Sequence, residues 1–227
     1  MFLDEYEQIL NGRLKERFDT FKNLLLEYNN KFNLTAITDE KDIYIKHFLD
    51  CVAGDMFFDE NVSVVEIGSG GGFPSIPLKL LREDLKFTLV ESTGKKCEYL
   101  KVVVDKLKLD CVQVVNARAE ELARDKNYRE KFDVCTARAV ARLNTLAEYC
   151  LPFVKVGGSF IAYKGSKIDE LIEAEKAIKV LGGDLFRKEN YVLPNGEVRS
   201  IIVIKKIKPT PEKYPRGQGK ERKSPII

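Results

Sequence analysis

A glycine-rich run near residue 70 holds the residue types that could bind a nucleotide. An apolar run over 62–67 contains Glu66 and leads directly into Gly68, Gly70 and Gly72. Glycines accept positive φ angles and let a ligand approach the backbone, and the free N–H groups of a helix start point into the same gap. The spacing predicts a strand, a glycine loop and a helix N-terminus that form a nucleotide site. A tight turn without a ligand is the simpler alternative.

The identity of the nucleotide depends on two further residues. A dinucleotide site has the spacing Gly-x-Gly-x-x-Gly, whose third glycine allows a helix to pack closely over a pyrophosphate. Counted from Gly68, that position holds Phe73, which counts against NAD or FAD. A second apolar run ends in Glu91, 23 positions after Gly68, close to the spacing of about 20 residues for a ribose-binding acid. One carboxylate can accept both ribose hydroxyl protons. A surface glutamate at a strand end is the alternative.

The elements that must position these residues alternate along the chain. Apolar runs predict strands at 62–67, 86–91, 111–115, 132–137 and 158–163, and helices at 74–82, 94–108, 119–125, 143–150 and 167–181. Such alternation implies a parallel sheet with helices on both faces. Two further runs, 184–193 and 198–207, flank Pro194-Asn195-Gly196-Glu197, which is typical of a hairpin. The fold class is therefore α/β, a Rossmann-like, mostly parallel sheet of seven strands with an antiparallel last strand.

The chain divides into three predicted parts. Residues 1–60 form a helical extension, since apolar residues recur at helical spacing from Leu14 to Tyr28 and a shorter helix is expected before residue 50. Residues 61–207 form the α/β domain, and 208–227 a basic C-terminal tail. The extension carries 7 Lys/Arg against 13 Asp/Glu, whereas residues 205–227 carry 8 Lys/Arg against 2 Glu. This asymmetry favours contact between the tail and a polyanion.

Composition limits the function classes. The 227 residues, 44% hydrophobic and 32% charged, are typical of one globular domain with appendages. The chain has no apolar run long enough to span a membrane, and its acidic start is unlike a signal peptide. Five cysteines without a Cys-x-x-Cys spacing predict reduced thiols in a cytoplasmic protein and no metal site. His47 and Cys51, four residues apart, are interpreted as packing residues.

Several motifs together are more specific than the glycine loop. The acidic residue before the loop resembles motif I of class I S-adenosylmethionine methyltransferases, in which the loop wraps the amino-acid end of the cofactor. The chain also contains, in order, Asn33-Leu34-Thr35-Ala36-Ile37, His47-Phe48-Leu49-Asp50, Gly68-Ser69-Gly70-Gly71-Gly72-Phe73-Pro74, Glu91-Ser92-Thr93-Gly94-Lys95-Lys96, Arg118-Ala119-Glu120-Glu121, Thr136-Ala137-Arg138-Ala139-Val140-Ala141-Arg142 and Pro211-x-x-Tyr214-Pro215-Arg216. From residue 33 to the C-terminus this resembles the bacterial RsmG family (glucose-inhibited division protein B), 16S ribosomal RNA guanine-N7 methyltransferases. Two positions depart from the family pattern: Cys51 stands where Ser is common, and Ser75 stands where Gly is usual.

The resemblance implies S-adenosylmethionine as cofactor and 16S rRNA or the small ribosomal subunit as partner, with a monomeric enzyme expected. The implied cofactor residues are Gly68, Ser69, Gly70, Phe73, Glu91, Ala119, Glu120 and Arg138. For Arg138, three roles stay open: the methionine carboxylate, an RNA phosphate, or a salt bridge to a neighbouring carboxylate. Candidate RNA contacts are Lys95, Lys96, Lys164, Tyr214 and Arg216. For the lysines a solvated face, and for the tail a disordered segment, are the simpler alternatives.

No catalytic residue is predicted. Guanine N7 carries a free lone pair, so methyl transfer to it needs alignment of the reactants and no base. Cys135 lies in an apolar strand without the context of a methyltransferase nucleophile, and the fourth strand lacks the Asp/Asn-Pro-Pro-Tyr signature of amine methylation. Other interpretations are a methyltransferase for a small molecule, an RNA-binding assembly factor with a degenerate cofactor site, and a nicotinamide dehydrogenase.

Overall fold

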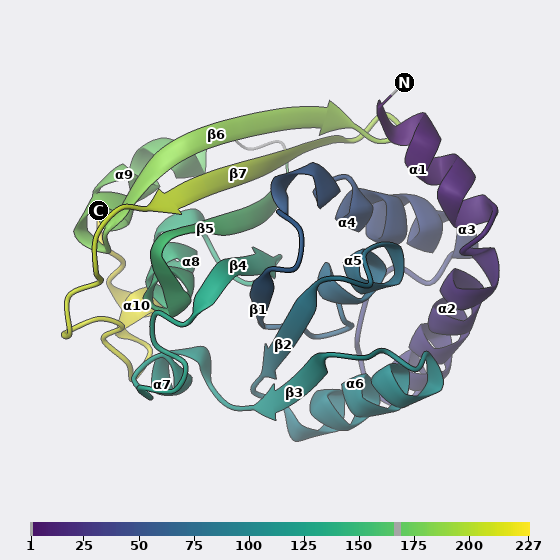
Figure 1. The fold of residues 1–227 in the computed structure, drawn as a ribbon, viewed down its shortest axis with the longest axis horizontal. Coiled ribbons are helices and arrows are strands. Elements are labelled where there is room, and N and C mark those ends of the chain that lie inside the picture. The colour runs from purple at the N-terminus through teal and green to yellow at the C-terminus, as the bar shows by residue number, and fades with distance from the viewer. Residues whose placement is uncertain (1, 166–168) are drawn as a thin grey trace.

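A single mixed sheet organises the chain in the computed structural model, which describes residues 2–165 and 169–227. The strand order is β3-β2-β1-β4-β5-β7-β6, with the first five strands parallel and β7 antiparallel to both β5 and β6 (Figure 1). The bounds are β1 Ser63–Ile67, β2 Lys86–Glu91, β3 Val112–Asn116, β4 Phe132–Arg138, β5 Val154–Gly165, β6 Gly183–Val192 and β7 Val198–Lys206. The predicted seven-stranded α/β sheet and its terminal hairpin are confirmed.

Helices cover both faces of this sheet, as the alternation predicted. The bounds are α1 Phe2–Asn11, α2 Lys15–Asn29, α3 Glu40–Asp42, η1 Ile43–Leu49, α4 Asp50–Val52, η2 Asp55–Phe57, α5 Ser75–Leu81, α6 Gly94–Lys106, α7 Ala119–Leu122, α8 Leu143–Cys150, η3 Leu151–Phe153, α9 Asp169–Val180 and α10 Lys220–Lys223. The predicted helix 119–125 is shorter than expected. The predicted start of another helix at 167 lies outside the described residues.

The first core joins the N-terminal helices to one face of the sheet. Phe18, Phe21 and Leu25 of α2, which share the face predicted from their spacing, are fully buried. They pack in one cluster with residues of α5 and α6, including Ile76 and Leu100. The N-terminal extension therefore shares one hydrophobic core with the helices that follow the glycine loop.

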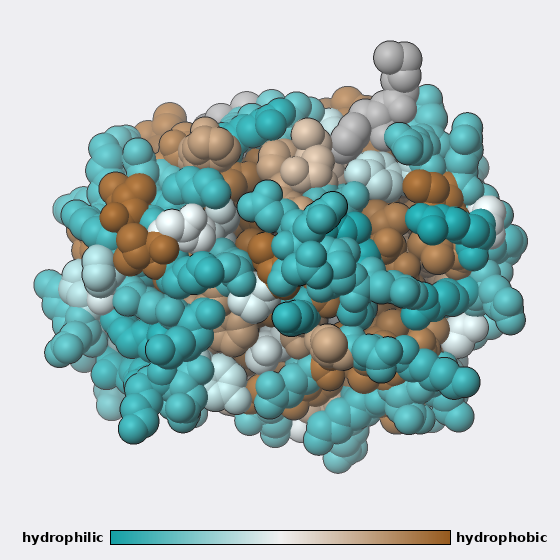
Figure 2. Space-filling model, in the orientation of Figure 1, coloured by the Kyte–Doolittle hydropathy of each residue, from teal (hydrophilic) through white to brown (hydrophobic). Residues whose placement is uncertain are grey.

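The second core lies on the other face, under α8 and α9. It includes Leu146 of α8 and Ile178 of α9, and Tyr214 of the C-terminal tail packs against it. Near the end of the tail, α10 lies beside α8 (Figure 1). The face drawn in Figure 2 is mostly hydrophilic, with apolar side chains gathered in separate patches.

Two departures from the sequence-based expectation concern local geometry. β5 begins at Val154, before the predicted residue 158, because a register shift between Phe132 and Val134 lets it pair with β4 on both sides of Gly157 and Gly158. Residues 43–49 form a π-helical turn inside a longer helix. Such wide turns are rare and occur often at functional sites.

Candidate functional site

The carboxyl ends of β1, β2, β3 and β4 surround one small cavity. In an open α/β sheet the ligand crevice lies at this edge, so the topology itself places the site. The cavity has a volume of about 90 Å³ and its lining comes from loops far apart in sequence. The lining residues are Ile67, Gly68, Val90, Ser92, Ala117, Arg118, Ala119, Glu120, Val140, Tyr149 and Arg222.

The glycine loop has the conformation that its residue types predicted. Gly68, Gly70 and Gly72 have φ angles of 71°, 52° and 90°, in the region that favours glycine. A Cβ atom on Gly68 would lie 2.8 Å from the Val140 side chain, and one on Gly72 would lie 2.6 Å from Ile76. The loop therefore depends on glycine both for its backbone conformation and for close contact with the β4 loop and α5.

Glu91 connects the loop to the end of β2. Its carboxylate accepts hydrogen bonds from the backbone N–H groups of Gly70, at 3.0 Å, and Thr93, at 2.8 Å. The side chain is almost buried, and among the described residues its only further bond is a long one of 3.5 Å from the Ser92 hydroxyl, so at least one of about four lone-pair sites remains for a ligand. The position and the unused acceptor capacity fit a ribose diol.

Beneath the loop lies a second carboxylate with an unused oxygen. Glu66 is fully buried, and its Oε1 accepts only a long bond of 3.4 Å from the Ser75 N–H. Among the described residues, Glu66 Oε2 and the hydroxyls of Ser69 and Ser75 are buried side-chain atoms without a hydrogen-bond partner. Burial raises the pKa of Glu66 to about 7, although the Ser75 backbone N–H and the Arg138 charge oppose the rise. A buried acidic group with this deficit fits the protonated amine of an amino-acid ligand.

Phe73 and Arg138 do not line the cavity. Phe73 stacks on His47 with ring centroids 4.3 Å apart, and the Arg138 guanidinium lies 4.9 Å from the Phe73 ring centre. Arg138 donates to Asp50 Oδ2 at 2.8 Å and to the Lys46 carbonyl at 3.0 Å. Of the three roles left open for Arg138, the structure shows the salt bridge to a neighbouring carboxylate. Both residues fasten the glycine loop to the N-terminal extension.

Sequence reasoning missed the polar network in which His47 takes part. Its Nδ1 lies 2.7 Å from Arg138 Nη2 and its Nε2 lies 2.8 Å from Thr35 Oγ1. Because an arginine can only donate, Nδ1 accepts and Nε2 carries the proton. Burial, followed by the Arg138 charge, lowers the pKa of His47 to about 3. Tyr191 completes the network by donating to Asp50 at 2.7 Å. The motif containing His47 and Asp50 was the available signal.

Ala119 and Glu120 lie where the third predicted strand leads into α7. Both line the cavity, and Glu120 is largely buried while its Oε1 accepts from Arg118 Nε at 2.8 Å. Ser92 lies across the same space. The sequence-predicted residues Gly68, Ala119 and Glu120 thus line one cavity. Two others, Gly70 and Glu91, are joined to each other by a hydrogen bond.

The candidate RNA contacts separate into two groups. Lys95 is exposed and Lys96 half-buried at the start of α6, next to Glu91. Lys164, by contrast, donates to the Ala141 carbonyl at 2.9 Å and pairs with a nearby glutamate, so it holds the loop after β4.

Tyr214 and Arg216 lie in a tail that is packed and hydrogen-bonded, unlike the disordered alternative. Arg216 makes three side-chain bonds to the buried carboxylate of Glu148, the shortest 2.8 Å. Tyr214 is half-buried, and its carbonyl accepts from Arg129 at 2.9 Å. Arg216 and Lys164 are thus already paired with carboxylates of the chain, and their contact with RNA stays a prediction.

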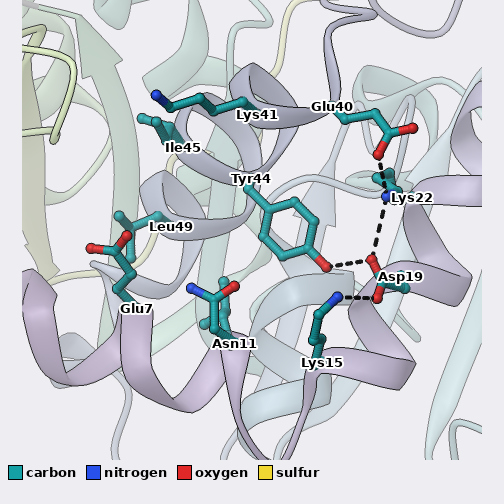
Figure 3. Close-up of a pocket in the computed structure, with 11 residues that line it drawn as sticks. Glu7, Asn11, Lys15, Asp19, Lys22, Glu40, Lys41, Tyr44, Ile45 and Leu49 are labelled. Atoms are coloured by element: carbon teal, nitrogen blue, oxygen red, sulfur yellow. Dashed lines mark hydrogen bonds and ion pairs between the residues drawn. The ribbon is translucent and has the colours of Figure 1, made fainter.

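A larger cavity, about 350 Å³, lies within the N-terminal extension (Figure 3). Asp19 is the centre of its polar lining and accepts from Lys15, Tyr44 and Lys22, while Lys22 also pairs with Glu40. Within this cluster the charges balance, because Lys15 and Lys22 face Asp19 and Glu40. We interpret the cluster as a structural connection between α2 and the helix over 40–52.

The described helices include none that is both long and apolar enough to cross a membrane.

Comparison with known proteins gives two kinds of similarity. Residues 14–192 match the model of the GidB family, described as rRNA small subunit methyltransferase G. A protein named ribosomal RNA small subunit methyltransferase G from Lactobacillus acidophilus is 47% identical over 99% of this chain and 96% of its own length. The protein of the same name from Brevibacillus brevis is 48% identical over 96% of this chain and 93% of its own.

Solved structures support the fold alone, because their sequences are distant. An O-methyltransferase from Bacillus cereus, in complex with SAH, has a TM-score of 0.58 and 16% identity over 82% of this chain and 91% of its own. TYW2 from M. jannaschii, in complex with AdoMet, has a TM-score of 0.54 and 20% identity, and the match covers 70% of this chain and 75% of TYW2. The architecture is thus that of a Rossmann-like methyltransferase.

Proposed function

This chain belongs to the GidB family, rRNA small subunit methyltransferase G, and we propose that it transfers a methyl group from S-adenosylmethionine to N7 of a guanine in 16S rRNA. The observation that carries the proposal is the identity of 47–48% with two named relatives over nearly the whole of both chains. The glycine loop, Glu66 and Glu91 supply a site that fits such a cofactor.

Each part of the cofactor has a matching group in the chain. Glu91 holds the ribose, since its carboxylate has free acceptor capacity at the mouth of the loop. Glu66 and the glycine loop hold the amino-acid end, where the unpartnered Oε2 meets a protonated amine. Ala119 and Glu120 border the adenine. The bound cofactor supplies an electrophilic methyl group on a sulfonium.

The side chains near this site agree with a reaction that needs no base. The lone pair of guanine N7 is free, so the protein has only to hold the base in line and exclude competing water. His47 has both ring nitrogens engaged within the chain and is neutral, and Cys135 is fully buried. Neither group is available as a proton acceptor or nucleophile, and the chain needs neither.

The proposed RNA surface lies beside the mouth of the cavity. Lys95 and Lys96 lie in the first turn of α6, shortly after the proposed ribose-binding Glu91, and among the described residues no carboxylate forms an ion pair with either. Cations at this position can contact phosphates on either side of an exposed guanine. The family description supports rRNA as the polyanion. A ribosomal substrate also implies that the enzyme acts in the cytoplasm, and we expect a monomer.

The test is methyl transfer from labelled S-adenosylmethionine to small-subunit RNA, or to subunits, from cells that lack this protein. We expect label on one guanine at N7, mapped by cleavage of the modified RNA. Label on another atom or another base of the RNA would overturn the proposed methylation at guanine N7. Transfer only to small molecules, or binding of NADH in place of S-adenosylmethionine, would overturn the proposed substrate or cofactor. Cofactor binding without any transfer to RNA would favour a non-catalytic assembly factor.

A further inference from the structure

The C-terminal tail is fastened along α8 by contacts between distant residues. Glu148 is fully buried and receives Arg216, as described above. Thr145 Oγ1 donates to the Glu221 carbonyl at 2.9 Å, and Arg124 donates to the Pro215 carbonyl. Glu221 is itself fully buried, and its carboxylate accepts the Gly217 N–H. These contacts fix the position of α10, so the residue after Glu221 has a defined location.

That residue is Arg222, and it lines the same cavity as Gly68, Ala119 and Glu120. Its guanidinium lies beside the Val140 carbonyl, at 3.4 Å, and close to the Tyr149 hydroxyl. Among the described residues no carboxylate forms an ion pair with Arg222, in contrast to Arg216 and Arg118. A cation on the rim of the cavity is thus left without a charged partner.

We propose that Arg222 is a cofactor-binding residue, which makes the C-terminal segment the outer wall of the pocket for the adenosine end of S-adenosylmethionine. This inference rests on the cofactor of the proposed function. The tail then serves the site from within the same chain, in place of the polyanion contact that its charge indicated.

The chemistry of arginine suits this position. A guanidinium is planar and weakly hydrated, so it can lie against an aromatic ring, and a purine offers such a face. The same side chain also keeps water from the rim of the cavity. Arg222 is exposed, as expected for a group that contacts a ligand from the solvent side. A lysine has the charge without the planar surface, so it replaces only part of the interaction.

The test is calorimetric titration of the full-length chain with S-adenosylhomocysteine, without RNA. Arg222→Ala is compared with the wild type, with Arg222→Lys, and with Lys223→Ala, a neighbouring exposed cation that does not line the cavity. We expect Arg222→Ala to weaken binding by about 5- to 30-fold, the range of one partly desolvated cation–π contact. Lys223→Ala should bind like the wild type, and Arg222→Lys should recover only part of the loss.

Equal affinities of the wild type and Arg222→Ala would overturn the inference while leaving the proposed function intact. The inference would also fail if Arg222→Ala binds S-adenosylhomocysteine normally but loses methyl transfer to RNA, since the residue would then contact RNA. No binding by the wild type would overturn the cofactor assignment and this inference with it. Thermal unfolding of each variant shows whether a loss of binding reflects loss of the fold.

Discussion

The buried carboxylate beneath the glycine loop predicts that cofactor binding depends on pH. The rise of the Glu66 pKa from 4.5 to about 7 means that the folded protein disfavours the ionised carboxylate by a net free energy of about 3 kcal/mol. If the ionised form meets the protonated amine of the cofactor, binding must also drive off a proton below pH 7. The affinity should therefore increase with pH until Glu66 is ionised in the free enzyme.

The size of the effect follows from the ionised fraction. With a pKa of about 7, that fraction rises roughly eightfold between about pH 6 and pH 7.5, and the dissociation constant should fall by the same factor. His47, the single histidine, has a pKa of about 3 and does not titrate in this range. Titration calorimetry with S-adenosylhomocysteine in buffers of different ionisation enthalpy measures the constant and counts the released protons.

Glu66→Gln supplies the matched control, because the amide keeps the shape and cannot ionise. The variant should bind more weakly near pH 7.5 and show no dependence on pH between 6 and 7.5. Without ligand it should also be more stable than the wild type above pH 7, by up to about 3 kcal/mol. The sign follows because a raised carboxyl pKa means that the folded wild type holds more protons than the unfolded chain, and so loses stability as pH rises from 4.5 to 7. Equal pH profiles for wild type and variant would refute the role of Glu66.

Three further predictions concern other contacts. Glu91→Ala removes a charged acceptor from the proposed ribose site, so the dissociation constant of S-adenosylhomocysteine should rise by about 10- to 100-fold in calorimetry; an unchanged constant would contradict the assignment. Lys95→Glu with Lys96→Glu should weaken RNA binding and lower the slope of log affinity against log salt by about two, leaving S-adenosylhomocysteine binding unaltered; an unchanged slope in filter binding would exclude phosphate contacts. Arg216→Ala leaves the buried Glu148 carboxylate unpaired, and urea unfolding should show a loss of about 3 kcal/mol, which Glu148→Gln in the same chain should partly restore.

The central part of the fold could be predicted from the sequence because its strands are buried on both faces. Central parallel strands appear as nearly continuous apolar runs, so the strands at 62–67, 86–91 and 132–137 were located to within a residue or two. The start of β5 was missed, since Gly157 and Gly158 interrupt its apolar pattern. The π-helical turn was also missed, because helical periodicity does not distinguish it from an ordinary turn.

The site could be predicted only where it is local in sequence. Gly68, Gly70 and Glu91 are arranged by one strand–loop–helix unit and its neighbour, whose topology is nearly fixed. The partners of the charged side chains are different: Arg216 pairs with a glutamate 68 residues away and Arg138 with an aspartate 88 residues away. A sequence shows that a cation is present and gives no sign of which distant carboxylate will neutralise it. The basic tail was therefore expected to contact RNA, whereas in the structure Arg216 binds Glu148 of the same chain.

The motifs that contain Thr35, His47 and Arg138 also depend on partners that are distant in sequence. Thr35, His47, Asp50 and Arg138 come from three segments, yet they form one hydrogen-bonded network against Phe73 of the glycine loop. A reaction at a free lone pair gains nothing from a base but loses rate when the reactants are misaligned. A buried polar network that is satisfied throughout is rigid and specifies one geometry. We infer that these residues serve the reaction by fixing the loop that holds the cofactor, which is why they resemble a functional motif without containing a catalytic group.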